Sequence, residues 1–145
     1  MSRAPMRARC PSADEVGVAT LDGFRFFITA DGYASVARAP GGRVHGLLWR
    51  LAPRDLAALN AYESLASGLY RTEVLPVRIA GRRAAALVYV ARSRVPGVPR
   101  PGYLEVVRAA ARDLDLPAAY REALARWTPA AQRARRAIES REVVA

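Results

Sequence analysis

Glu63 is the side chain whose type and setting best suit acid–base chemistry in this sequence. Its neighbours are largely apolar or aromatic, and no arginine lies within seven residues on either side. It also falls near the predicted C-terminal end of a helix, where the helix dipole disfavours a negative charge. Both features raise the pKa of a carboxyl group, which suits a group that relays protons near neutral pH. The same pattern also fits a partly exposed glutamate that ends a helix.

Four other side chains carry possible chemistry. His45, the only histidine, lies in a predicted buried strand, as a structural histidine would. Cys10, the only cysteine, has no base beside it, so a chance thiol explains it better than a nucleophile. Tyr70 and Tyr103 closely follow glycines at the starts of predicted elements, where each hydroxyl points into a cleft or each ring simply packs. One histidine and one cysteine exclude an internal disulfide and zinc sites that need several such ligands.

The length and composition indicate one globular domain with a core. The chain has 145 residues, of which 52% are hydrophobic and 25% charged. Its longest uninterrupted apolar run, residues 84–91, is far shorter than the roughly 20 residues of a membrane helix. No signal-peptide pattern opens the sequence, so we expect a cytoplasmic location and no membrane partner.

The charge is strongly positive, but its distribution favours a small anionic substrate over nucleic acid. The net charge is +10, and all 23 basic residues are arginine, a bias that GC-rich codons produce. A nucleic-acid-binding module would show a basic stripe with interleaved aromatic residues. Here the arginines are scattered, and only Arg133, Arg135 and Arg136 cluster tightly. We therefore expect no nucleic-acid partner, and keep such a module as the third hypothesis for function.

Glycine-containing breaks divide the chain into predicted strands. Asp22-Gly23 predicts a hairpin or a tight β-connection, a second Asp-Gly at 31–32 precedes a short strand, and Pro40-Gly41-Gly42 predicts a turn. The clearest hairpin lies further on, where two β-branched and apolar runs flank Gly81. The predicted strands are residues 16–21, 24–29, 34–38, 43–51, 71–80 and 83–92.

Helices are predicted between and after these strands. Pro53 suits the first helical turn of a segment that ends by Gly68, and Asp55 lies where the helix dipole favours an anion. Three prolines exclude a helix from residues 95–102. The remaining predicted helices are residues 103–114 and 117–127, and a last one capped by Thr128. This order predicts an α+β fold with a mainly antiparallel, barrel-like sheet and flanking helices.

Six short motifs, in order along the chain, resemble the gamma-glutamylcyclotransferase-like (AIG2-like) family. They are Met6-Arg7-Ala8-Arg9-Cys10-Pro11, Val44-His45-Gly46-Leu47-Leu48-Trp49, Asp55-Leu56-Ala57-Ala58-Leu59-Asn60-Ala61-Tyr62-Glu63, Gly68-Leu69-Tyr70-Arg71, Pro99-Arg100-Pro101-Gly102-Tyr103 and Leu116-Pro117-Ala118-Ala119-Tyr120. The resemblance implies a domain over residues 1–127 with a small mixed, barrel-like sheet. Residues 128–145 would then form a C-terminal basic helix and tail.

The resemblance also implies a reaction that needs no cofactor and no metal. The α-amine of a gamma-glutamyl group attacks its own side-chain carbonyl, so that 5-oxoproline forms and an amine or amino acid leaves. Glu63 stands at the position of the family's catalytic glutamate, and Tyr70 and Tyr103 match its pocket tyrosines. Because the nucleophile is already tethered to its electrophile, one proton-relaying carboxyl group suffices.

One departure concerns the N-terminus. The family opens with an apolar strand ending in Tyr-Gly-Ser-Asn, whose loop cradles the glutamyl group, whereas this chain starts at Met1-Ser2-Arg3. We expect either that translation starts further upstream or that the chain is a truncated, non-catalytic relative that binds a small ligand or a protein. A sheet edge left open by the absent strand would allow an oligomer.

Overall fold

Four antiparallel strands form one sheet that is not closed. The computed structural model describes residues 2–62 and 68–142, and the side chains of these as far as residue 137. The strand order is β2–β1–β3–β4. Their bounds are Asp14–Ile28 for β1, Ala34–Arg50 for β2, Tyr70–Ile79 for β3 and Arg82–Ala91 for β4. The predicted α+β class and antiparallel sheet are confirmed, while the barrel stays open among the described strands.

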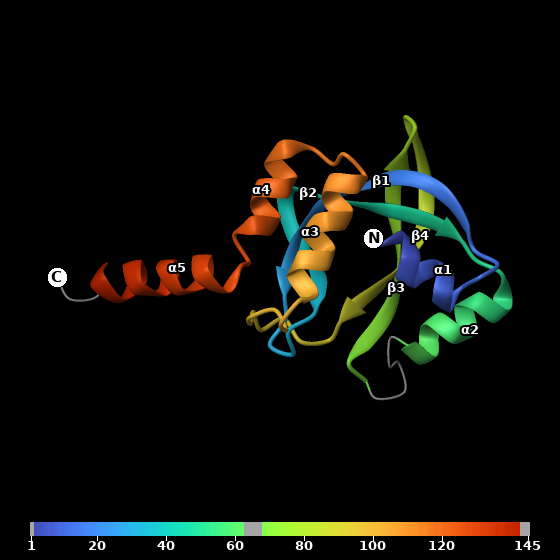
Figure 1. Cartoon of the computed structure of the whole chain (residues 1–145). Helices are drawn as coiled ribbons and strands as arrows, with labels where there is room; N and C mark the ends of the chain where they lie inside the picture. Colours follow the sequence, from blue (N-terminus) through green and yellow to red (C-terminus); the bar gives the residue numbers. More distant parts are fainter. Residues whose placement is uncertain (1, 63–67, 143–145) are drawn as a thin grey trace.

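Helices cover the sheet from two sides. Their bounds are Arg3–Arg9 for α1, Pro53–Tyr62 for α2, Tyr103–Asp113 for α3, Ala118–Ala125 for α4 and Pro129–Glu142 for α5. Figure 1 shows α3 and α4 beside β2, α1 and α2 together at the other end of the molecule, and α5 projecting away from the body. The starts of α2, α3 and α5 and the hairpin around Gly81 agree with the sequence predictions.

Helix α1 has no counterpart among the elements predicted from the sequence. This helix has seven residues, no buried residue and no side-chain cap at its N-terminus. An ion pair attaches the helix to β1, because the Arg3 guanidinium forms a bidentate pair with the Glu15 carboxylate of that strand. Because α1 buries no apolar face, its sequence carries no helical hydrophobic pattern from which it could be recognised.

Two predicted turns are wrong, and for one shared reason. Asp22-Gly23 lies inside β1 and Pro40-Gly41-Gly42 lies inside β2, opposite each other, where the register shifts between the pair Asp22–Arg43 and the pair Phe24–Arg38. Gly23 has a φ of 77°, so it serves a β-bulge rather than a chain reversal. A Cβ on Gly42 would collide with the Phe24 carbonyl, which explains the glycine there. The chain reverses at the second Asp-Gly instead, between β1 and β2.

Apolar side chains form two clusters, and Val44 of β2 packs against both. One cluster joins β1, β3 and β4 and contains Ala19, Leu21, Phe24, Leu75, Val77 and Ala86. The other contains Ala111, Leu116, Tyr120 and Leu124, and it packs against Phe26 of β1 and Val44 of β2. The second cluster packs α3 and α4 against the sheet.

Candidate functional site

Tyr70 and Tyr103 meet at one backbone residue, Ala34. Tyr70 begins β3, Tyr103 begins α3 and Ala34 begins β2, so three segments distant in sequence converge at one corner of the sheet. The Tyr70 hydroxyl donates to the Ala34 carbonyl oxygen at 3.3 Å, and the Ala34 N–H donates to the Tyr103 hydroxyl at 3.2 Å. Both rings are half-buried. We call these three residues the tyrosine site.

Ser35 joins the tyrosine site to β4. Its side chain is 5% exposed, and its Oγ accepts a hydrogen bond of 2.9 Å from the Ala91 N–H. Ala91 is in turn the strand partner of Tyr70. This bond links β2 to β4, the two edge strands, so the open sheet is tied across at this corner. Such a tie gives the tyrosine site a rigid base.

Tyr33 packs against Tyr103, and Arg100 packs in turn against Tyr33. The rings of Tyr33 and Tyr103 make an edge-to-face contact with centroids 5.4 Å apart. The Arg100 guanidinium lies 4.9 Å from the Tyr33 ring centroid, and its Nε donates to the Asp31 carbonyl oxygen at 3.0 Å. Neither Tyr33 nor the role of Arg100 could be predicted from local sequence, because the two residues are far apart in the chain.

The proline-rich loop after β4 is fastened to the turn between β1 and β2. The Gly97 N–H donates to the Ile28 carbonyl oxygen at 2.8 Å, and the Arg100 N–H donates to the Gly32 carbonyl oxygen at 3.1 Å. Gly97 packs so closely that a Cβ there would collide with the Thr29 carbonyl oxygen. The loop leads directly into Tyr103, so these contacts determine where the Tyr103 ring lies.

Glu63, the predicted acid–base residue, lies outside the described residues. The helix that precedes it, α2, ends at Tyr62 and is held from two directions. The Tyr89 hydroxyl of β4 donates to Oδ1 of Asn60, and the Arg9 guanidinium of α1 lies 3.4 Å from the Tyr62 ring centroid. Tyr89 is two residues from Ala91 on β4, so the end of α2 is attached to the strand that also supports the tyrosine site.

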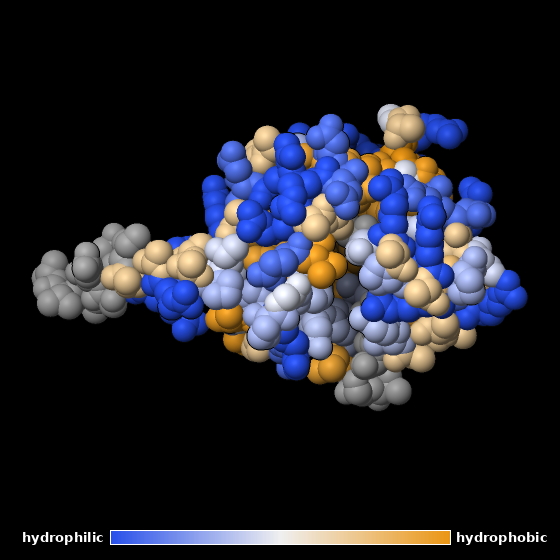
Figure 2. Space-filling view, viewed as in Figure 1, coloured by the Kyte–Doolittle hydropathy of each residue, from blue (hydrophilic) through white to orange (hydrophobic). Residues whose placement is uncertain are grey.

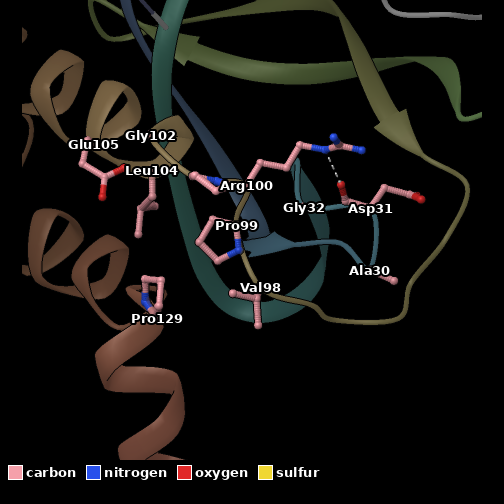
Figure 3. Close-up of a pocket in the computed structure, with 11 residues that line it drawn as sticks. Ala30, Asp31, Gly32, Val98, Pro99, Arg100, Gly102, Leu104, Glu105 and Pro129 are labelled. Atoms are coloured by element: carbon pink, nitrogen blue, oxygen red, sulfur yellow. Dashed lines mark hydrogen bonds between the residues drawn. The ribbon is translucent and has the colours of Figure 1, made fainter.

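A cavity of about 560 Å³ borders the same loop but is not lined by either tyrosine. Figure 3 shows the Arg100 side chain turned toward Asp31, with Pro99, Leu104 and Pro129 on the other side. The cavity is lined by Ala30, Asp31, Gly32, Val98, Pro99, Arg100, Pro101, Gly102, Leu104, Glu105 and Pro129. Prolines and glycines make up much of this wall, its carboxyl groups are those of Asp31 and Glu105, and Arg100 donates to the Asp31 backbone carbonyl oxygen.

His45 and Cys10 have contacts of their own, apart from the tyrosine site. His45 Nδ1 lies 3.2 Å from Thr20 Oγ1, and its ring makes an edge-to-face contact with Tyr120. Burial, and then the charges of nearby arginines, lower the pKa of His45, while burial raises the pKa of Tyr120 to about 12. The fully buried Cys10 donates to the Asp55 carbonyl oxygen, and burial raises the pKa of its thiol. A buried thiol of raised pKa is a poor nucleophile.

Neither a metal cluster nor a membrane helix is found in the part of the chain described. Residues 2–62 and 68–142 contain no group of three or more histidine, cysteine, aspartate or glutamate side chains placed to hold a metal ion. None of the helices among those residues is long and apolar enough to cross a membrane.

The fold and the site together define a small α+β protein with one open antiparallel sheet and a tyrosine site at a corner of that sheet. The chain belongs to the family described as gamma-glutamyl cyclotransferase, AIG2-like, whose model matches residues 2–106. The matched segment contains the whole sheet and ends just beyond Tyr103, so it includes every residue of the tyrosine site.

Individual relatives agree with this assignment. The chain is 28% identical over 96 residues to the gamma-glutamylcyclotransferase of Homo sapiens, an alignment that covers 64% of this chain and 50% of the relative. The chain thus spans about half the length of the curated relatives it matches. A solved structure named gamma-glutamyl cyclotransferase superposes with a TM-score of 0.77 at 25% identity, covering 86% of this chain and 80% of the other. YkqA from Bacillus subtilis superposes with a TM-score of 0.70 at 27% identity, covering 78% and 44%.

Proposed function

We propose that this protein is a gamma-glutamylcyclotransferase-type enzyme. It cyclises the gamma-glutamyl group of a small molecule to 5-oxoproline and releases the attached amine or amino acid. The observation that carries this proposal is the convergence of Tyr70 and Tyr103 on Ala34. The family resemblance implies that both tyrosines are pocket residues, and they come from two different elements.

Tyrosine hydroxyls suit the substrate that this reaction needs. A gamma-glutamyl group carries an α-ammonium, an α-carboxylate and a side-chain amide, and a phenol is both a donor and an acceptor of hydrogen bonds. In the proposed complex Tyr70 and Tyr103 bind the polar end of the glutamyl group. Their shared attachment to Ala34 holds the two hydroxyls in a fixed relation, which lowers the entropy cost of binding.

The proton transfers are assigned to Glu63. Its carboxylate takes a proton from the α-ammonium, and the resulting amine attacks the side-chain carbonyl carbon to form the new C–N bond. The bond from that carbon to the leaving nitrogen then breaks as Glu63 returns the proton to this nitrogen. As the intermediate collapses, the attacking nitrogen also gives up its second surplus proton, which passes through Glu63 to the departing nitrogen. The products are 5-oxoproline and an ammonium, and atoms and charge balance without water, metal or cofactor. Tethering of the nucleophile supplies effective molarity in place of a nucleophilic side chain.

The test is an assay of the full chain, and of a form extended upstream, against a panel of gamma-glutamyl amino acids and gamma-glutamyl amines. Formation of 5-oxoproline is the readout. The Glu63→Gln variant should lose turnover by about a thousandfold or more, since general acid–base catalysis contributes factors of this order. Asp113→Asn, at an exposed position of α3, is the matched control and should keep full activity. Equal turnover in Glu63→Gln and wild type would remove Glu63 from the mechanism, and saturable binding without turnover would identify a non-catalytic relative.

A further inference from the structure

A second cavity, of about 280 Å³, lies between α3 and α4, away from the tyrosine site. Its floor is made by small or apolar side chains, and its rim carries charged ones. The lining residues are Arg108, Ala111, Arg112, Ala118, Arg121, Glu122, Leu124 and Ala125. Figure 2 shows strongly hydrophilic residues gathered over α3 and α4 on this face of the molecule. We call this cavity the arginine pocket.

The charges around the arginine pocket are not balanced. Arg108, Arg112 and Arg121 contribute three positive charges and Glu122 one negative charge, which leaves two positive charges in excess. The ion pairs found among the described side chains are made by other arginines, namely Arg3, Arg7, Arg43, Arg71 and Arg78. Within the same part of the chain, no carboxylate oxygen lies within 4.0 Å of the three pocket guanidinium groups.

Arg121 has a hydrogen-bond donor without an acceptor among the described residues. Its Nε is shielded from solvent and has no acceptor, and it is the one buried side-chain nitrogen or oxygen in this condition among the residues described. A buried donor without an acceptor is costly, and native structures contain few of them. The Nε–H and one terminal N–H of a guanidinium form a fork that binds two oxygens of one anion.

We propose that the arginine pocket binds a small phosphate-bearing anion, held by Arg108, Arg112 and Arg121. The excess of two positive charges matches a phosphate group, which carries roughly −1.5 to −2 near pH 7, better than it matches a single carboxylate. Arginine forks are also the side chains best suited to bind phosphate oxygens in pairs. This site is independent of the proposed cyclotransferase reaction, and nothing in that reaction uses these residues.

The size of the arginine pocket limits the ligand to a small one. Its volume of about 280 Å³ lies just below the range of roughly 300–1,000 Å³ that drug-sized ligands occupy. Inorganic phosphate or a short phosphomonoester therefore fits inside it. A nucleic-acid strand would need basic contacts along an extended groove, and the three arginines instead surround one concave spot.

The experiment is calorimetric titration of the full chain with inorganic phosphate and with glycerol 3-phosphate, at constant ionic strength. We expect saturable binding of one anion per chain. The Arg112→Gln/Arg121→Gln variant should weaken it about tenfold or more, since each loses charge-assisted hydrogen bonds. Arg82→Gln/Arg83→Gln removes two exposed positive charges from the start of β4 and should leave the affinity unchanged. Tighter binding of glycerol 3-phosphate would identify a phosphomonoester as the ligand, and equal binding would identify free phosphate.

An independent readout needs no variant. Phosphate added to the wild-type chain should shift the amide resonances of α3 and α4 in NMR spectra and leave those of the β3–β4 turn unchanged. The proposal is overturned by non-saturable binding, by equal loss of affinity in the two double variants, or by shifts spread over arginines throughout the chain. Tighter binding of a short DNA duplex than of phosphate, abolished equally by both double variants, would also overturn it in favour of a general nucleic-acid surface.

Discussion

Tyr70 and Tyr103 are joined through a single residue, since one hydroxyl binds the carbonyl of Ala34 and the other binds its N–H. The two tyrosines begin different elements, β3 and α3, and Ala34 begins a third, β2. A displacement of any one of these three starting points therefore moves the hydroxyls relative to each other. The two tyrosines are therefore coupled through Ala34, and a substitution of one should change the position of the other's hydroxyl.

The first prediction concerns the two hydroxyls. Tyr70→Phe and Tyr103→Phe should each raise KM for a gamma-glutamyl substrate about tenfold, the worth of one good hydrogen bond, with a smaller effect on kcat. The double variant should show less than the product of the two single effects, because both tyrosines act through Ala34. Steady-state assays of 5-oxoproline release measure all three.

Tyr33→Phe is the matched control for that prediction. Its ring also contacts Tyr103, but its hydroxyl makes no hydrogen bond to any residue of the described part of the chain. Removing this hydroxyl keeps the aromatic contact and should leave KM unchanged. A rise in KM for Tyr33→Phe as large as that for Tyr103→Phe would show that the hydroxyls are not what binds the substrate.

The second prediction concerns the loop that carries Tyr103. Gly97→Ala places a Cβ against the Thr29 carbonyl oxygen, so the loop must move away from the turn between β1 and β2. The expected loss in the free energy of unfolding is about 1–3 kcal/mol, the usual cost of overpacking. Chemical denaturation measures it. Gly46→Ala, in β2, has nothing within 4 Å of the added Cβ and should change stability by less than about 0.5 kcal/mol.

Local pattern was enough to predict most elements, and it failed where pairing between strands decides the outcome. The hairpin around Gly81 and the helix from Pro53 follow from short-range signals, and both are confirmed. Asp22-Gly23 and Pro40-Gly41-Gly42 are equally strong turn signals, yet they became facing irregularities within two long strands. Neither segment alone indicates that the other will lie opposite it, because this depends on the register in which β1 pairs with β2.

The candidate site could also be predicted only in part: single residues were identified from motifs, but contacts between distant residues were not. The sequence motifs identified Tyr70 and Tyr103, and the structure brings them together, but Glu63 lies outside the described residues, so its role stays a prediction. The sequence places Tyr89 in a predicted strand, and Asn60 in a predicted helix and in one of the family motifs. Their hydrogen bond spans 29 positions of the chain, and no periodicity in the sequence indicates it.

The third prediction concerns that hydrogen bond. Tyr89→Phe removes the donor to Asn60 and so releases the end of α2 from β4, immediately before Glu63 in the sequence. If Glu63 is the acid–base residue, kcat should fall about tenfold or more with little change in KM, because a small misplacement of a catalytic group is costly. Asn60→Asp keeps an acceptor for Tyr89 and should retain most of the activity. Unchanged kcat in Tyr89→Phe would show that this contact does not position Glu63.

The fourth prediction concerns Asp55 at the start of α2. Its side chain is 2% exposed, and Oδ2 accepts a hydrogen bond of 3.3 Å from the Ala52 N–H, as the third helical residue of a capping box does. Asp55→Ala should lower the free energy of unfolding by about 1–2 kcal/mol, the range for a lost cap. Asp113→Ala, at an exposed position of α3, is the comparison and should cost far less. Equal losses in the two variants would contradict a capping role for Asp55.

The last prediction is a pH dependence of stability that belongs to His45. Burial, followed by the charges of Arg43 and Arg78, lowers the pKa of His45 below its ordinary value of 6.5, while Asp22 opposes this weakly. Below about pH 6.5 the unfolded chain therefore binds a proton at His45 more readily than the folded chain does. Stability should be complete above this pH and should decrease as the pH falls below it.

His45 is the only histidine, so this part of the pH profile can be isolated by one substitution. Urea unfolding of the wild type between pH 7.5 and pH 5 should show the decrease, and His45→Gln should flatten it in the same range. The carboxylates of Glu15 and Asp22 do not interfere, because hydrogen bonds from Arg3 and Arg78 lower their pKa values below the ordinary ones. Their contribution to stability is lost only at more acidic pH. If the slopes of His45→Gln and wild type coincide between pH 7 and pH 5, the folded protein binds the imidazole proton as readily as the unfolded chain does. The burial of His45 against Tyr120 and Thr20 would then have no electrostatic cost.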